Sequence, residues 1–324
     1  MDFLWSNHFP CLESLDFTSA GPLEDHPDDE QMFFEAYSSQ TRPKLIFANP
    51  PPQLRSIKIN GVMNVHIFGS ISRHHFSGLS DIDISFAGFH PDINQIYSLL
   101  EANPCLASLC FNSEQVDPGL DDRATVGVRS RPRLTLSSLV SLSFVHIVNP
   151  DWNISVLKTF MAPALQHLKL SYWDGSDSSQ LLADYISNQG TDSSPYFPIT
   201  LNRLSFFTIM GDTPNPECLL RAYPNITVLH TGSLAPLLKR PWLLPNLRCL
   251  SVATQDAVEF KNVVLERCRD GLPLENVELR WFGDKPLPSE DEEQIGKIVN
   301  LTVSIILLHE VESRNPDDDG EEQP

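Results

Sequence analysis

Apolar residues return along this chain in one short spacing. Two apolar positions stand three residues apart, a third follows two residues later, and the positions around them are mostly polar or small. A turn rich in Pro or Ser usually precedes the group. We call this group the frame. It occurs ten times, and the first apolar residues of its copies are Leu12, Leu54, Leu79, Leu106, Leu139, Leu165, Leu204, Ile226, Leu247 and Leu274.

The frame predicts short β-strands. Side chains alternate across a strand, so the last two apolar residues of a frame point into the core and the residues flanking them point outward. Successive frames begin 21 to 42 residues apart, close to the period of leucine-rich repeats, whose units must stack into a solenoid to bury their apolar side. We therefore expect parallel strands near 14–18, 56–60, 81–85, 107–112, 141–145, 167–171, 205–209, 227–231, 248–252 and 276–280.

The segments between frames predict helices. The clearest one follows Pro91, where apolar residues recur at helical spacing as far as Ala102. Gly271 is a plausible stop for the helix expected over 256–269. The expected fold is thus α/β: a leucine-rich-repeat solenoid whose curved parallel sheet carries helices and loops on its convex side. Further helices are expected at 154–161, 179–188, 216–222 and 290–299, and a closing strand at 301–308.

The domain organisation follows from the same pattern. Residues 1–308 form one solenoid of about ten repeats. Three polar insertions, near 21–50, 113–135 and 174–200, are expected as loops on its rim or back. The segment 309–324 is acidic and poor in apolar residues, which predicts a disordered tail.

The outward positions of the frames define the expected binding surface, since the concave face of stacked repeats is where such proteins bind partners. Phe206, Met210 and Val228 are apolar at positions predicted to point outward. Either they form an exposed anchor patch for a protein partner, or a loop such as the 174–200 insertion covers them. The candidate partner-binding residues are Lys58, Asp81, Asp83, His167, Lys169, Phe206, Met210, Val228 and His230.

Composition narrows the class of partner and the compartment. The chain has 23 Lys and Arg against 42 Asp and Glu, a formal net charge of −19, which argues against binding nucleic acid or an anionic membrane. No apolar stretch approaches the ~20 residues of a membrane span, and the N-terminus lacks the pattern of a secretion signal. The six cysteines form no C-x-x-C pair, and we interpret them as buried or half-buried thiols. A cytoplasmic or nuclear protein is expected.

Several phrases of the chain carry a resemblance to a known family. LLEANPCLASLCF, FMAPALQHLKL, LLRAYPNITVLHT and LPNLRCLSV resemble the repeat half of F-box-like proteins of mushroom-forming fungi. The resemblance implies a ubiquitin-ligase subunit whose F-box binds the adaptor Skp1 and whose repeats present a substrate protein. The first frame begins at Leu12 and no Leu-Pro-x-Glu stretch precedes it, so we expect Skp1 as a partner only if an F-box lies outside this chain. The frames also lack the Asn that many repeat families place three residues after the last apolar position, which implies irregular curvature.

One pattern points to an enzyme instead. Gly69-Ser70 followed by Asp81 and Asp83 resembles the motif of nucleotidyltransferases, in which a Gly-Ser turn grips a phosphate and two alternate carboxylates bind magnesium. His74 replaces a glycine of that motif, and no clear third carboxylate follows. Both aspartates are also ordinary outward positions of the third frame. We therefore interpret the chain as a non-enzymatic scaffold for an unidentified protein ligand, with a metal-dependent nucleotidyltransferase as the alternative.

Four histidines are candidate metal ligands by residue type. His66, His74, His75 and His90 follow no ligand spacing of a helix or hairpin. We interpret them as surface residues, and neither a metal nor a cofactor is expected.

Overall fold

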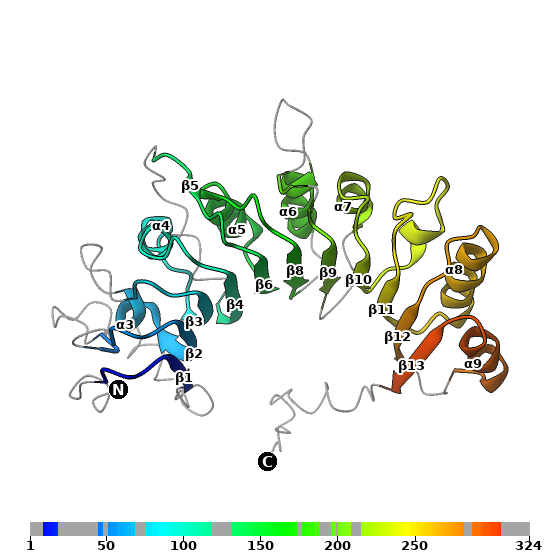
Figure 1. The fold of residues 1–324 in the computed structure, drawn as a ribbon, viewed down its shortest axis with the longest axis horizontal. Helices are drawn as coiled ribbons and strands as arrows, with labels where there is room; N and C mark the ends of the chain where they lie inside the picture. Colours follow the sequence, from blue (N-terminus) through cyan, green and yellow to red (C-terminus); the bar gives the residue numbers. More distant parts are fainter. Residues whose placement is uncertain are drawn as a thin grey trace, which may run out of the picture. The chain divides into compact units, whose positions relative to one another are not determined.

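The computed structural model describes residues 9–18, 45–47, 51–68, 76–117, 131–173, 177–187, 196–198, 200–208, 215–281 and 287–305 (Figure 1). The chain divides into two compact units, which are described separately. Unit 1 comprises Met1–Leu201 and Thr208–Pro214, and unit 2 comprises Asn202–Phe207 and Asn215–Pro324. The predicted tail at 309–324 and most of the predicted insertions near 21–50 and 113–135 lie outside the described residues, whereas more than half of 174–200 is described.

Among the described residues of unit 1, six strands pair in parallel and in chain order. They are β1 (Ser14–Thr18), β2 (Ser56–Met63), β3 (Asp81–Gly88), β4 (Ser108–Val116), β6 (Ser141–Ile147) and β8 (His167–Tyr172). A second small sheet pairs β5 (Leu134–Thr135) with β7 (Phe160–Met161) in parallel. The helices are α3 (Asn64–Phe68), α4 (Ile93–Glu101), α5 (Pro150–Leu157) and α6 (Asp177–Ser187). Figure 1 shows α4, α5 and α6 on one side of the six strands.

Unit 2 follows the same plan. Its described strands also pair in parallel and in chain order. They are β9 (Arg203–Thr208), β10 (Val228–Thr231), β11 (Cys249–Thr254), β12 (Asn276–Trp281) and β13 (Asn300–Ile305). The helical segments, again on one side of the strands (Figure 1), are α7 (Glu217–Ala222), the 3-10 turn η3 (Ala235–Leu238), α8 (Ala257–Arg269) and α9 (Ser289–Gly296). In each unit we call the sheet face opposite these helices the strand face.

The predicted α/β class and the parallel strand direction are confirmed in both units. An observed strand overlaps each of the ten predicted ones. β3 and β4 run on to Gly88 and Val116, past the ends that the frame predicted. The closing strand expected at 301–308 overlaps β13, and residues 306–308 lie outside the described residues.

A repeated set of backbone hydrogen bonds explains why the frame makes a strand at each place. The Leu106 amide donates to the Asn103 carbonyl at 3.1 Å, closing a turn, and the amides of Ala107 and Ser108 both donate to the Ser80 carbonyl, at 2.7 and 3.1 Å. These bonds fix where β4 begins relative to β3, because they satisfy the backbone groups at the strand start. The same turn bond forms at the amides of Leu12, Leu54, Leu139, Leu165, Leu201, Ile226 and Leu247.

The turn bonds also correct one predicted register. In β9 the turn closes on Leu201, whose amide donates to the Pro198 carbonyl at 3.1 Å, so the frame begins at Leu201 and not at Leu204. Leu204 then pairs with Leu229, and Phe206, with 0% of its surface exposed, lies in the core. The prediction that Phe206 points outward is therefore wrong. Two consecutive phenylalanines satisfy the apolar spacing in both registers, so spacing alone did not separate them.

The predicted helices are present, with boundaries set by their caps. Asp92 caps α4 in a reciprocal capping box, its side chain accepting from the Asn94 amide at 2.6 Å. α5 begins at Pro150, four residues before its predicted start at 154, because the Asn149 side chain caps it and proline is favoured in a first turn. α8 ends just before Gly271, which has a φ of 74°, as predicted. The frame did not predict α3, β5, β7 or η3.

The cysteines differ from expectation at two positions. All six are free thiols, and four are half-buried. Cys11 and Cys105, however, are exposed. Each stands between a proline and the first apolar residue of its frame, in the turn before the strand, where the side chain reaches solvent.

Candidate functional site

Two aligned rows of side chains lie on the strand face of unit 1. The parallel register places equivalent outward positions of all six strands side by side. The first row is Ser14, Ser56, Asp81, Ser108, Ser141 and His167, and the second row is Asp16, Lys58, Asp83, Cys110, Ser143 and Lys169. Five of the nine predicted binding residues therefore lie on this one surface.

Charge alternates along the second row. Asp16, Lys58 and Asp83 occupy directly neighbouring positions on β1, β2 and β3. Opposite charges at neighbouring positions of adjacent strands attract each other. Lys169 adds a second cation on β8. A surface that carries positive and negative side chains at fixed positions favours partners with the complementary pattern of charge.

Cys110 belongs to this polar row as a hydrogen-bond donor. Its thiol bonds to the Asp83 carboxylate. Burial first, and then the charge and hydrogen bond of Asp83, raise the pKa of the Cys110 thiol to about 12, against the opposing effect of Lys169 and Lys58. The thiol is consequently neutral at physiological pH, whereas a nucleophilic cysteine needs a lowered pKa.

A group that the sequence analysis missed lies at the carboxyl ends of β4, β6 and β8. His146 has a φ of 54°, in the left-handed region, where the pairing of β6 with β8 shifts register. Its Nδ1 lies 2.9 Å from Asn112 Oδ1 and 3.6 Å from Glu114 Oε2, and its ring meets Trp173 edge-on at 6.0 Å. Trp173 is 41% exposed. Strained backbone of this kind persists only when its surroundings hold it, and it is concentrated at binding sites.

The protonation of His146 follows from these neighbours. Asn112 Oδ1 accepts from the Glu114 amide at 3.0 Å, which identifies it as the oxygen and places the imidazole proton on Nδ1. Burial lowers the pKa of His146, Lys169 lowers it further, and Glu114 opposes both. The neutral ring therefore presents Nε2 as an acceptor close to the exposed Trp173.

The strand face of unit 2 carries the other predicted residues. His230 lies in a row with Ser205, Ser251, Glu278 and Thr302. Ser251 Oγ donates to Glu278 Oε2 at 2.8 Å, and Arg280 Nε donates to its other oxygen at 3.1 Å. The Ser251 bond is the largest cause that lowers the pKa of Glu278, and Arg280 and His230 lower it too.

The predicted apolar anchor patch is not formed by the described residues. Phe206 is in the core, Met210 lies outside the described residues, and Val228 is half-buried on the strand face of unit 2. Lys169 and His230, expected beside the patch, belong to different units. Trp173 is the large exposed aromatic side chain beside the strands of unit 1, whereas Phe207 on the strand face of unit 2 is half-buried.

The two aspartates of the enzymatic alternative lie on the same face of β3, as predicted. Asp81 accepts a hydrogen bond from Ser80 Oγ at 2.6 Å, while Asp83 faces Lys58 and Cys110. Within the described ranges, no group of three or more His, Cys, Asp or Glu is placed to hold a metal ion. The other half of the motif, Gly69-Ser70, lies outside those ranges, as do His74 and His75.

His90 is a core residue, so its interpretation as a surface histidine is wrong. It is 2% exposed, its Nε2 lies 2.7 Å from Ser113 Oγ, and its ring stacks on Trp152 at 4.2 Å. β3 and β4 extend beyond the frame, and this places His90 beside Ser113 in the core. The apolar spacing did not indicate the extension.

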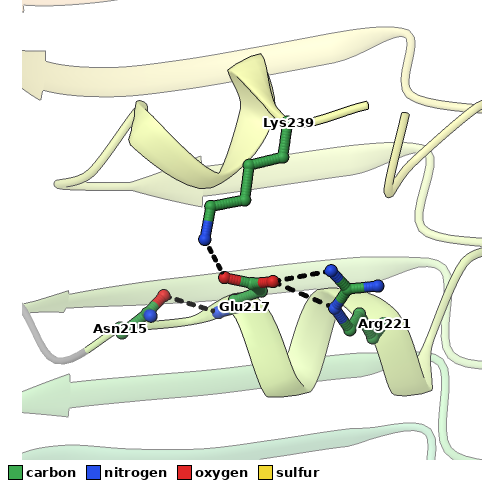
Figure 2. A network of polar contacts seen from close by, with 4 residues as sticks. All are labelled: Asn215, Glu217, Arg221 and Lys239. Atoms are coloured by element: carbon green, nitrogen blue, oxygen red, sulfur yellow. Dashed lines mark hydrogen bonds and ion pairs between the residues drawn. The ribbon is translucent and has the colours of Figure 1, made fainter. Parts of the chain in front are cut away.

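On the helix side of unit 2, a polar network joins α7 to η3 (Figure 2). Glu217 accepts from both Nε and a terminal nitrogen of Arg221, at 3.0 and 2.7 Å, and pairs with Lys239. Its amide donates to Asn215 Oδ1 at 3.0 Å. The bonds from Lys239 first and Arg221 second lower the pKa of Glu217. Both cations of the network pair with the Glu217 carboxylate, so we interpret the network as structural.

No family model matches the chain, and no curated protein shows a significant match. In the part of the chain that the structure describes, no helix is long and apolar enough to cross a membrane.

Proposed function

We propose that this chain is a non-enzymatic scaffold that binds another protein on the strand face of unit 1. The observation that carries the proposal is the alternating second row, Asp16, Lys58, Asp83, Cys110, Ser143 and Lys169, which ends beside the group of His146 and Trp173. An exposed Trp held by fixed polar neighbours has the composition of an interface hot spot. The charged row around it supplies orientation and selectivity more than affinity.

The fold supports the same class of function. Short parallel strands, most of them entered by the same turn bond and separated by helices or loops, are what an irregular leucine-rich-repeat solenoid requires. We accordingly propose this architecture and, from the resemblance stated above, a role like that of the substrate-binding half of a fungal F-box-like ubiquitin-ligase subunit. On this proposal the strand face of unit 1 holds the substrate protein, in the cytoplasm or nucleus, and any contact with Skp1 needs an F-box outside these residues.

The alternative, a metal-dependent nucleotidyltransferase, has the alternation of Asp81 and Asp83 in its favour. That alternation is equally a property of every outward pair on a strand. Asp83 is already engaged by the Cys110 thiol and faces Lys58, a cation, on the neighbouring strand. A magnesium site concentrates acidic oxygens instead, so the scaffold is the better supported function.

The test is a binding assay on paired variants. A partner captured from cell extract by the whole chain is purified, and its affinity is measured for the wild type, for Trp173→Ala and for Leu181→Ala, which removes a 50% exposed side chain from α6 on the helix side. Losing a hot-spot Trp costs about 2 kcal/mol or more, which weakens binding about 30-fold. The control is expected to bind like the wild type. Equal loss in both variants, or loss in neither, contradicts the proposed surface.

A further inference from the structure

β13 is the last strand of unit 2, and one of its edges has no neighbour in the part of the chain that the structure describes. The strand pairs in parallel with β12 over all six of its residues. The Asn300 amide points toward β12, donating to the Glu275 carbonyl at 3.1 Å. Because successive residues of a strand direct their backbone groups to opposite sides, those of Leu301, Val303 and Ile305 point to the outer edge.

This edge lacks the features that usually protect one. Proteins block open edges with charged residues, proline or bulges. The sequence NLTVSI contains no charge and no proline, and its pairing with β12 has no register shift. Leu301 and Val303 are half-buried, while their partners Val277 and Leu279 on β12 are 1% and 0% exposed. The terminal strand therefore offers both backbone hydrogen bonds and apolar area to an added strand.

The surroundings of the edge are acidic. α9 packs against β13, and Glu290, Glu292 and Glu293 are exposed on it. Glu293 pairs with Lys297 at 2.7 Å, which leaves Glu290 and Glu292 as the dominant charges of this helix surface. The sequence beyond β13, residues 310–324, has seven acids against Arg314 alone. A second copy of the chain would bring two such acidic surfaces together, whereas a basic segment complements them.

We propose that the outer edge of β13 binds an extended, basic peptide segment of a partner protein as an additional β-strand. In this recognition mode main-chain hydrogen bonds supply affinity and alternate side chains supply selectivity. The backbone groups of Leu301, Val303 and Ile305 form the ladder, the half-buried apolar residues receive apolar side chains, and α9 attracts the basic ones. This site is independent of the strand face of unit 1, and neither proposal requires the other.

A defined probe tests the idea. It is a synthetic peptide of alternating Lys and Val, six residues long like β13, with two matched peptides: one carries Glu in place of Lys, and one is N-methylated at every residue so that neither of its edges has an amide to donate to a ladder. Fluorescence anisotropy with the full chain is expected to show salt-dependent binding of the basic peptide, and binding about tenfold weaker or absent for both matched peptides.

Variants of the protein locate the site. Val303→Pro removes an outward amide while leaving the bonds to β12, a position where an edge strand tolerates proline, and is expected to weaken binding about tenfold. Val303→Ala separates this effect from lost apolar area. Glu290→Gln with Glu292→Gln is expected to weaken binding about threefold. Its control, Glu13→Gln with Glu101→Gln, changes the net charge equally at exposed positions of unit 1 and is expected to change nothing.

Each contrary result overturns the proposal. Equal binding of the N-methylated peptide excludes strand addition, and equal binding of the acidic peptide excludes a basic partner. Absence of binding refutes the site outright. Concentration-dependent self-association that Val303→Pro abolishes, measured by light scattering, assigns the edge to a second copy of this chain instead. The strand-face proposal survives any of these results, because it is tested by Trp173→Ala in unit 1.

Discussion

Phe206→Ala provides a direct test of the register of β9. The Phe206 side chain is 0% exposed and pairs across from Thr231 in the core of unit 2. Truncating a buried Phe to Ala typically lowers the free energy of unfolding by about 3–5 kcal/mol, from lost transfer energy and the cavity left behind. With a urea dependence of about 2 kcal/mol per molar, the unfolding midpoint is expected to fall by about 2 M.

Phe207→Ala is the matched control for that measurement. Phe207 is half-buried and, as the next residue in the strand, points to the other face of the sheet. Its truncation is expected to cost about 1 kcal/mol, as is usual for a residue outside the core. Urea unfolding followed by far-UV circular dichroism compares the two variants. If Phe207→Ala is the more destabilising, the frame begins at Leu204 after all, and the register argued from the turn at Leu201 is wrong.

Further predictions concern the second row and the adaptor. Burial first and then Asp83 raise the pKa of the Cys110 thiol to about 12, so iodoacetamide at pH 8 should modify the exposed Cys105 much faster than Cys110. Asp83→Asn should lower the pKa of Cys110 and speed its labelling, as measured by mass spectrometry. Unchanged labelling of Cys110 in the variant contradicts the assigned hydrogen bond. The double variant Asp81→Asn with Asp83→Asn should have the circular dichroism spectrum of the wild type. The wild type should show no magnesium-dependent nucleotide transfer. A transfer activity that is present in the wild type and lost in the double variant would establish the enzymatic alternative. These residues alone should not retain purified Skp1 in a pull-down, and retention would place an adaptor contact within the repeats.

The strands were predictable because the frame records a physical requirement that recurs in each unit. Three apolar side chains must enter the core, and the turn before them must close on the first, as it does at Leu106 and Ile226. Proline in the turn and alternation in the strand express this requirement in sequence. Prediction failed where two registers met it equally, at Phe206 and Phe207, because only the partner strand and the turn bond at Leu201 distinguish them.

The candidate site was only partly predictable. Lys58, Asp83 and Lys169 could be placed on one face because alternation and parallel register are enough to align them. The group around His146 could not be predicted. It depends on a register shift in the pairing of β6 with β8 and on the left-handed backbone of His146, and no residue pattern indicates either. Trp173 follows the end of β8 and lies beyond any frame, so the spacing gave it no role.

β13 shows that burial of a frame residue is a property of the stack and not of the frame. The Ile298 amide closes a turn on the Ile295 carbonyl at 2.9 Å, and Ile298, Leu301 and Val303 repeat the frame spacing. This eleventh copy makes a strand as the others do, yet Leu301 and Val303 are only half-buried. The difference arises because each strand is buried by its neighbours on both sides, and β13 pairs with β12 alone in the described residues. The same local sequence is thus buried where strands flank it on both sides and forms an accessible apolar edge where the stack of strands ends. At that edge an added strand finds both unpaired backbone groups and apolar surface.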